Sequence, residues 1–150
     1  MQNRDERIFQ VIDALGYISL LQDARSAKLL SNFGVNYSQF LVLFLLGNDL
    51  QRRWTITELS SHLEMQLPGL SKVVRFLEGK KWVSIHGDKE DARKKRITIL
   101  SAGIKKRQDT LIALLPVLNE TFADWSIEEL ELFLSYLERL KGYLDQNRMP

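Results

Sequence analysis

The segment from Gln66 to Leu100 constrains the fold more than any other part of this sequence, because its apolar spacing changes from a helical to an extended period. Pro68 suits the first turn of a helix, where its missing N–H costs no hydrogen bond. One apolar face at helical spacing follows, formed by Leu70, Val73, Val74 and Leu77. The opposite face presents Gly69, Ser71, Lys72, Arg75 and Phe76. Small, hydroxyl and basic side chains of this kind can meet a nucleic acid.

Two segments with alternating apolar residues follow this helix. Val83 and Ile85 alternate with polar neighbours in the first segment, as Ile97 and Ile99 do in the second, which is typical of half-buried strands. The loop between them, residues 86–95, is charged and has no apolar anchor. A helix followed by a two-stranded ribbon with a basic tip is the layout of a winged helix-turn-helix. We therefore expect a mainly α protein with a two-stranded β wing.

Positive charge is concentrated in the same part of the chain, although the formal net charge is only +2. Between Gln66 and Arg107 there are twelve Lys or Arg and four Asp or Glu, whereas the remainder holds nine basic and fifteen acidic residues. A concentrated basic region on an otherwise acidic chain is the electrostatic footprint of phosphate contact. The alternative is a solvated charged face without a partner.

The residues before this segment predict a long helix and a buried one. Apolar residues at helical spacing favour a helix from about Arg4 to Leu30, which Asn32-Phe33-Gly34 would end. A second helix is expected from about Ser38 to Asn48, with Asn36 or Ser38 as its cap. This second helix is apolar nearly all round, so it should form the buried centre of the domain.

A short helix is predicted next, from Glu58 to about Glu64, with Thr57 as its N-cap. Met65-Gln66-Leu67 would form a tight turn between this helix and the one that begins at Pro68. Two helices joined so closely form a helix-turn-helix, whose second member enters the major groove of DNA.

Two more helices are expected after the ribbon. Ser101 would cap the first of them. Pro116 should kink or break that helix near residues 112–115, because proline lacks the backbone N–H and clashes with the preceding turn. Ser126 and Glu129 form a capping-box pattern that begins a last helix, which extends to about Leu144.

The composition excludes several classes of protein. There is no cysteine, which rules out disulfide frameworks and thiolate metal sites. The longest apolar run, Phe40 to Leu46, is too short to span a bilayer, and the polar N-terminus is unlike a signal peptide, so we expect a cytoplasmic location. His62 and His86 are too few and too scattered for a metal sensor. Without a phosphate-binding loop or a nucleophile motif, we expect no enzyme activity, no catalytic residues and no cofactor.

The terminal helices exceed what a winged helix requires. Residues 38–100 would form the winged-helix lobe, whereas residues 1–35 and 101–150 carry apolar faces that must be buried against something. We expect a second copy of the chain to cover them in a homodimer, since a single helix-turn-helix seldom contacts enough bases to select a site. The alternative is that these helices fold back on their own chain.

The order of these features resembles the MarR family of bacterial winged helix-turn-helix regulators over nearly the whole chain. The family's wing pattern is an Asp, one residue, an Arg, and then a strand ending in Leu-Thr or Leu-Ser before a helix with Gly. This sequence has that pattern at Asp91, Arg93, Leu100, Ser101 and Gly103. The matching residues before the wing are Tyr37-Ser38-Gln39-Phe40, Thr57-Glu58-Leu59, Leu63, Ser71, Val74, Leu77-Glu78 and Gly79 to Val83.

The resemblance implies a homodimer joined by its terminal helices, with a recognition helix in the major groove and Arg93 in the adjacent minor groove. A narrow minor groove has a strong negative potential that attracts an inserted guanidinium. Asp91 would hold that guanidinium by a charge-assisted bond, and Lys94 and Lys95 would neutralise phosphates. The alternative for Arg93 is a structural salt bridge with Asp91 that only fixes the wing.

On the recognition helix, Lys72 and Arg75 are the best candidates for reading guanine edges, and Ser71 is a lesser one. Gln66 and Ser71 also suit phosphate contacts, and Gly69 belongs to the same candidate surface. The alternative for the two cations is a solvated helix face.

These features predict a sequence-specific regulator of transcription that binds double-stranded DNA. We expect a repressor that acts on a pseudo-palindromic promoter site, and the resemblance to the MarR family implies that a small-molecule effector can release it. No residue pattern identifies that effector. The aromatic residues that could line a cleft, although core positions are their commoner role, are Phe9, Phe33, Tyr37, Trp54 and Tyr136. The competing interpretation is a winged-helix protein–protein adaptor, or an architectural DNA-binding protein without a ligand response.

Overall fold

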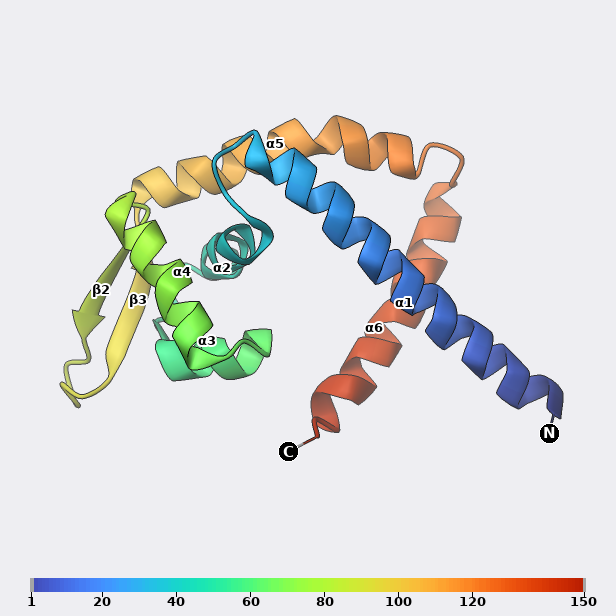
Figure 1. Cartoon of the computed structure of the whole chain (residues 1–150), viewed down its shortest axis with the longest axis horizontal. Coiled ribbons are helices and arrows are strands. Elements are labelled where there is room, and N and C mark those ends of the chain that lie inside the picture. Colours follow the sequence, from blue (N-terminus) through green and yellow to red (C-terminus); the bar gives the residue numbers. More distant parts are fainter. Residues whose placement is uncertain (1, 150) are drawn as a thin grey trace. The chain divides into compact units, whose positions relative to one another are not determined.

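The computed structural model describes residues 2–149, and its helices and strands follow the predicted order (Figure 1). The ends of the expected terminal ranges, Met1 and Pro150, lie outside the described residues. The elements are α1 (Gln2–Ser31), α2 (Tyr37–Asn48), β1 (Trp54–Thr55), α3 (Ile56–Leu63), α4 (Leu67–Gly79), β2 (Val83–Gly87), β3 (Lys95–Ile99), α5 (Ser101–Thr121) and α6 (Ile127–Gln146). The chain forms two compact units, residues 1–113 and 114–150. None of the helices between residues 2 and 149 has the length and apolar character needed to cross a lipid bilayer.

Gly34 ends α1, as predicted, because it adopts a left-handed conformation with φ of +69°. The Gly34 N–H donates to the carbonyl of Ser31 at 3.1 Å, and the Val35 N–H donates to the carbonyl of Leu30 at 3.4 Å. These two bonds form a Schellman motif, which satisfies carbonyls that the helix end would leave unpaired. Leu30 and Val35 are both buried, so the turn also fixes the end of α1 on the first unit.

Asn36 is the cap of α2, which decides between the two predicted candidates. Its side chain accepts a bond from the Gln39 N–H, and the Gln39 side chain accepts one from the Asn36 N–H, each at 2.9 Å. The prediction that α2 is the buried centre is confirmed by its place in the hydrophobic core. That core contains Val42, Leu43, Leu46, Trp54, Leu59, Leu70, Val73, Val74, Leu77, Val83 and Ile97.

The predicted start of α3 is wrong by two residues. Thr55, not Thr57, is the N-cap: its hydroxyl accepts a bond from the Glu58 N–H at 3.1 Å, and the Glu58 carboxylate accepts one from the Thr55 N–H at 2.9 Å. This reciprocal pair requires Glu three residues after the cap, which Thr55 has and Thr57 lacks. With Thr55 as the N-cap, α3 begins immediately after β1.

The three strands form one antiparallel sheet in the order β1-β3-β2. Alternation along the strands divides its side chains between two faces. Val83 and Ile97 are buried on the inner face, which confirms the predicted period of two. The outer face carries polar, partly exposed residues of β2 and β3, which can meet solvent or a ligand. These residues are Ser84, His86, Arg96 and Thr98, whereas Thr55 of β1, which pairs with Arg96, is buried.

Two predictions about α5 are corrected. The helix begins at Ser101, so that residue is its first member and not its cap. Pro116 lies inside α5, which continues to Thr121, so of the predicted kink or break, the break does not occur. Proline removes only the single bond to the carbonyl of Ile112, and helical bonds remain on both sides of it.

In the second unit, the predicted capping box at the start of α6 is confirmed. The Ser126 hydroxyl accepts a bond from the Glu129 N–H at 3.1 Å, and the Glu129 carboxylate accepts one from the Ser126 N–H at 2.8 Å. The ring of Trp125 lies 5.5 Å from Phe122 and 5.3 Å from Phe133 between centroids. This aromatic group anchors the turn before α6, although no residue of α6 itself is buried.

Candidate nucleic-acid interface

A tight turn joins α3 to α4 and is fixed by Ser60, a residue that the sequence patterns did not single out. The Ser60 hydroxyl donates to the carbonyl of Met65 at 2.6 Å, and the Ser60 carbonyl accepts the N–H of Met65 at 3.0 Å. Glu64 between them is left-handed, with φ of 50°. These contacts set the direction in which α4 leaves α3, as a helix-turn-helix requires.

The predicted buried face of α4 is confirmed: Leu70, Val73, Val74 and Leu77 all lie in the core. This burial fixes the rotation of α4 about its axis and therefore decides which residues face outward. The residues of α4 that were predicted to contact DNA and are exposed are Gly69, Lys72 and Arg75. Ser71 is half-buried, and the exposed Gln66 is the N-cap residue, with no side-chain bond to the helix.

Phe76 does not belong to this outward face, contrary to the sequence-based expectation. It is half-buried against the core, and its ring meets Trp82 edge-on with 6.2 Å between centroids. The side chains of Lys72 and Arg75, in contrast, form no hydrogen bond or ion pair with any residue in the described range 2–149. Because no acid among these described residues pairs with them, both cations are available to an external anion.

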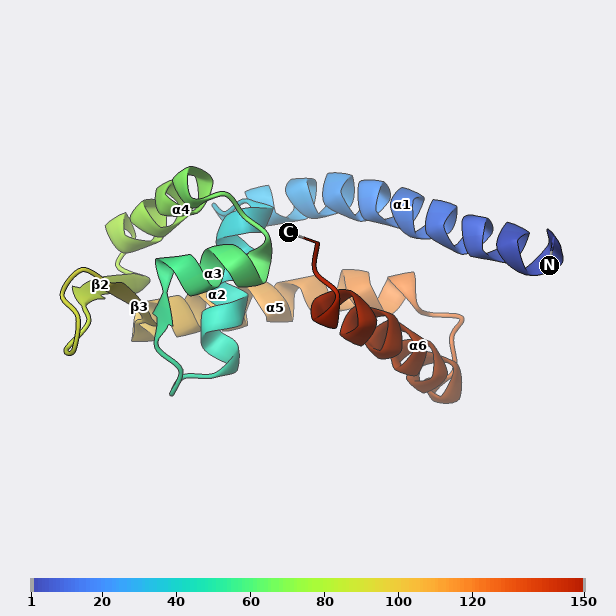
Figure 2. The same cartoon turned by 90° about the horizontal axis from the view of Figure 1, so that it is seen from below.

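The hairpin of β2 and β3 projects from the first unit, with residues 88–94 at its tip (Figures 1 and 2). The tip is ordered by its own hydrogen bonds. The Asp88 N–H donates to the carbonyl of Lys94, and the Lys94 N–H donates to the carbonyl of Asp91, both at 2.9 Å. The Asp88 carboxylate accepts the N–H groups of Glu90 and Asp91 at 2.8 and 3.1 Å. These bonds hold the loop in one shape without an apolar anchor.

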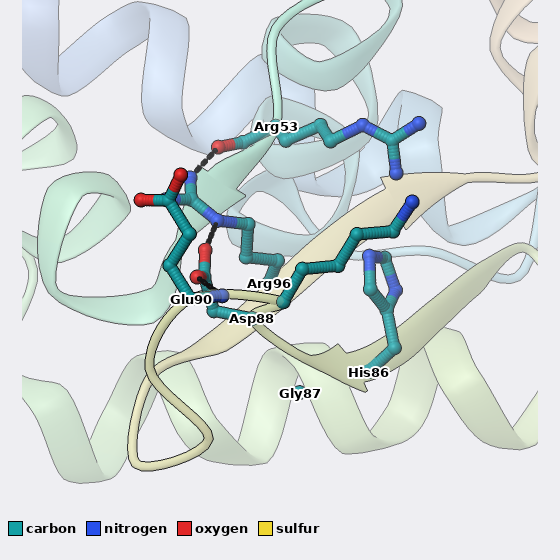
Figure 3. Close-up of a pocket in the computed structure, with 7 residues that line it drawn as sticks. Arg53, His86, Gly87, Asp88, Glu90 and Arg96 are labelled. Atoms are coloured by element: carbon teal, nitrogen blue, oxygen red, sulfur yellow. Dashed lines mark hydrogen bonds and ion pairs between the residues drawn. The ribbon is translucent and has the colours of Figure 1, made fainter.

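A side-chain clamp ties this tip to the sheet (Figure 3). The Arg96 Nε donates to the carboxylate of Asp88, and an Arg96 terminal nitrogen donates to the carbonyl of Arg53 at 2.6 Å. The Arg96 bond and the two backbone N–H groups lower the pKa of Asp88 from 3.8 to about 2, because all three favour the charged carboxylate. The same ion pair raises the pKa of Arg96. No sequence pattern identifies either residue as a support of the wing.

The predicted contact between Asp91 and the guanidinium of Arg93 is not formed. The Asp91 carboxylate instead accepts the backbone N–H of Arg93 at 3.0 Å. Among residues 2–149 no ion pair joins the two side chains, so Asp91 fixes the backbone from which Arg93 extends and leaves its guanidinium exposed. The alternative of a structural Asp91–Arg93 salt bridge does not describe this wing, because Asp88 and Arg96 form that bridge.

The three wing cations that were predicted as DNA contacts lie together beside the first turn of α3. Arg93, Lys94 and Lys95 are exposed and line one recess of about 490 Å³. Its other wall consists of Thr55, Ile56, Thr57 and Glu58. Basic side chains around an open recess can neutralise the phosphates of a duplex that passes over them.

Two of the basic residues counted in the cationic segment have structural roles. Arg96 belongs to the clamp described above. Arg107 donates to the carbonyl of Phe44 at 3.3 Å and to the side chain of Asn48 at 2.7 Å, at the C-terminal end of α2. A cation at that end of a helix also opposes the negative pole of the helix dipole. Fewer basic side chains are therefore available to bind phosphate than the count of Lys and Arg in this segment indicates.

The aromatic and histidine residues considered for an effector or a metal have different surroundings in the structure. In the first unit, Trp54 is buried in the core, the ring of His62 lies 5.1 Å from the Trp54 ring between centroids, and Phe9 is exposed on α1. Tyr136 belongs to the second unit. Within residues 2–149, no three metal-ligating side chains come together.

No family model matches this sequence. The chain is 27% identical to the HTH-type transcriptional regulator PapX of Escherichia coli over 101 residues, which cover 67% of this chain and 62% of PapX. The matched part thus spans less than two thirds of PapX. Identity to the HTH-type transcriptional regulator YwoH of Bacillus subtilis is 30% over 111 residues, covering 74% of this chain and 78% of YwoH. Among solved structures, the Staphylococcus aureus MepR–DNA complex matches with a TM-score of 0.72 and 24% identity, over 87% of this chain and 95% of MepR, and it supports the fold.

Proposed function

Because this chain belongs to the MarR family of winged helix-turn-helix transcriptional regulators, we propose that it represses transcription by binding a pseudo-palindromic promoter site in double-stranded DNA as a homodimer. The observation that carries the proposal is the pair of unneutralised cations on α4, Lys72 and Arg75, beside a wing with an exposed Arg93. A solved relative of this fold, MepR, is known as a DNA complex, which adds support.

In this proposal, α4 enters the major groove with its exposed face toward the base edges. Lys72 and Arg75 then donate to the acceptors of guanine, and Ser71 and Gln66 bond to phosphates. Gly69 leaves room for a close approach of the duplex, because an added Cβ there would meet nothing within 4 Å in the free protein. The buried face of α4 supports this role, since it prevents the helix from rotating away.

The wing occupies the neighbouring minor groove. Arg93 inserts its guanidinium, which a narrow, A·T-rich groove attracts most strongly. Lys94 and Lys95 contact phosphates without regard to sequence. Asp91 contributes by holding the backbone of Arg93, and the Asp88–Arg96 clamp keeps the whole tip in place.

Dimerisation is supported by apolar side chains that the single chain leaves exposed. On α1 these are Ile8, Phe9, Val11, Ile12, Tyr17, Ile18, Leu20 and Leu21, and on α6 they are Ile127, Leu132, Leu134, Tyr136, Tyr143 and Leu144. Apolar surface of this extent on a helix is characteristic of a protein–protein contact. A two-fold dimer would set two α4 helices roughly 34 Å apart, on successive turns of the same DNA face.

A small effector can release such a dimer only by preferring a form in which the two α4 helices are wrongly spaced. We propose that this is how repression ends. The competing interpretation, a protein–protein adaptor or an architectural protein, predicts no such response to a ligand and no preferred DNA sequence.

The test is a salt titration of binding to a duplex selected from fragments of the source genome. We expect the logarithm of the affinity to fall steeply with the logarithm of salt concentration, and the selected site to bind at least about a thousandfold better than random DNA. Sedimentation should show a dimer, and transcription in vitro from the selected promoter should fall as protein is added. Binding that ignores sequence would support the architectural alternative, and no binding at low salt would support the adaptor.

A further inference from the structure

We propose that a recess on the outer face of the wing, formed by Arg53, His86 and Lys89, binds a phosphate of the DNA backbone outside the stretch that α4 covers. The inference rests on the proposed DNA binding and extends it. It assigns a contact to the connector before β1, which belongs neither to the helix-turn-helix nor to the tip cations considered above.

The recess has a volume of about 320 Å³ and is built by three separate segments (Figure 3). Arg53 comes from the connector before β1, His86 from β2, and Lys89 from the wing tip. The register pairs Trp54 with Ile97 and His86 with Arg96, so Arg53 lies beside Thr98 and both are on the outer face of the sheet. The His86 Nδ1 lies 3.5 Å from the Thr98 hydroxyl, within this face.

Charges are separated within the recess. Its two acids are directed toward Arg96: the Asp88 carboxylate bonds to it, and the Glu90 carboxylate lies on the same side (Figure 3). The guanidinium of Arg53 and the ring of His86 lie together on the other side (Figure 3). In the described part of the chain, residues 2–149, neither the Arg53 guanidinium nor the Lys89 ammonium has a hydrogen-bond or ion-pair partner.

Two unpaired cations and an imidazole around one recess match the chemistry of a phosphate. A guanidinium can donate two parallel bonds to phosphate oxygens, and an ammonium adds a point charge. The backbone at Arg53 is held in place, because its carbonyl accepts the 2.6 Å bond from Arg96. Only the rotamers of the Arg53 side chain then need ordering when the phosphate binds.

The two faces of the sheet separate this site from the recognition helix. α4 packs with Val83 and Ile97 of the inner face, whereas His86 lies on the outer face of β2, and Arg53 precedes β1 at the sheet edge opposite β2. We therefore expect a phosphate held on this outer face to lie beyond the half-site that α4 reads. As a result, we expect the protein to contact a longer stretch of DNA than the helix-turn-helix and the inserted wing tip would cover by themselves.

Two duplexes separate this contact from the rest of the interface. One ends at the base pairs under Arg93, and the other continues outward by about half a helical turn, roughly five base pairs. On the long duplex, the variant Arg53→Ala with Lys89→Ala should bind roughly tenfold more weakly, and its salt slope should be smaller by about two. On the short duplex it should match the natural protein. Lys28→Ala, which removes an exposed charge on α1, is the control and should change neither duplex.

The substitution leaves the Arg53 carbonyl in place, so the clamp to Arg96 persists, and circular dichroism should confirm an unchanged fold. Equal binding of the variant and the natural protein to the long duplex would overturn the inference while leaving the proposed function intact. Failure of the natural protein on both duplexes would instead refute the proposed function itself, and the inference with it. A titration with inorganic phosphate tests whether the recess binds the DNA backbone or free phosphate. Shifts of the His86 ring signals would show that phosphate fills the recess. If DNA binding were not weakened at that phosphate concentration, the assignment to DNA would be overturned.

Discussion

Asp88 and Arg96 form an ion pair that joins the start of the wing tip to strand β3. Arg96 extends this connection to a third segment, because it also bonds to the carbonyl of Arg53 before β1. The pair therefore holds together the tip, the middle strand and the edge of the sheet. A two-stranded ribbon without an apolar anchor depends on such polar contacts for a fixed shape.

Asp88→Asn should loosen the wing without unfolding the protein. The amide cannot pair with Arg96 as a charged acceptor, and the N–H groups of Glu90 and Asp91 lose part of their bonding. We expect faster hydrogen exchange at residues 89–94, several-fold weaker DNA binding and a modest fall in Tm, because the ion pair is lost while the hydrophobic core is unchanged. Asp109→Asn, which breaks the exposed pair with Lys105, is the control. Unchanged exchange in the tip would contradict a clamping role.

The same clamp should resist acid. Since the pKa of Asp88 is lowered from 3.8 to about 2, its contribution to folding is complete above pH 3.8 and is lost as the pH falls through about 2. NMR titration of the Asp88 carboxyl carbon should show its midpoint near that lower value. In Arg96→Ala the midpoint should move up toward 3.8, because the largest cause of the shift is removed. A titration of the natural protein near pH 4 would argue against the ion pair.

Gly103→Ala should be destabilising because α5 begins against the backbone of Trp82. A Cβ at residue 103 would overlap the Trp82 carbonyl oxygen, which also accepts the N–H of Leu100 at 2.8 Å. Backbone atoms cannot move aside as a flexible side chain can, so we expect a loss of about 1–3 kcal/mol in the free energy of unfolding. Urea denaturation measures it. Gly79→Ala, whose Cβ would meet nothing within 4 Å, should cause no loss.

The elements of the fold could be predicted from the sequence where the signal is local. The buried face of α4, the alternation of β2 and β3 and the capping box at Ser126 each depend on residues only a few positions apart. All three predictions are confirmed. The start of α3 could also have been found, since Thr55 and Glu58 show the same capping pattern as Ser126 and Glu129. Thr57 was the wrong choice because it lacks a Glu three residues later.

The supports of the interface could not be predicted in this way. Arg96 reaches back 43 residues to the carbonyl of Arg53, and Arg107 reaches back 63 residues to Phe44. Charge and spacing do not distinguish these two arginines from Arg93, which stays exposed. The position of α5 beside α2, and of β3 beside β1, decides which arginines bond to backbone carbonyls of their own chain. The DNA contacts assigned to Arg93 and its neighbours remain predictions.

Gly69→Ala should affect stability and DNA binding in opposite directions. The added methyl group meets nothing within 4 Å and replaces glycine in a helix, so the free energy of unfolding should rise by up to about 1 kcal/mol. DNA binding should weaken, because the methyl group fills space that the duplex occupies in the proposed complex. Gly79→Ala at the other end of α4 should keep the natural affinity. Undiminished binding by Gly69→Ala would remove this residue from the interface.

Arg75→Ala and Arg93→Ala should impair DNA recognition in different ways. Arg75 lies on the exposed face of α4, so its loss should cost about 1–3 kcal/mol at one position of the half-site and relax base choice there. Arg93 extends from the wing tip, so its loss should matter most where the flanking minor groove is A·T-rich and narrow. Binding measured on duplexes that vary either the half-site or the flank separates the two effects. If both variants lost affinity equally on every duplex, α4 and the wing would not have separate roles, and the cations would act only through their charge.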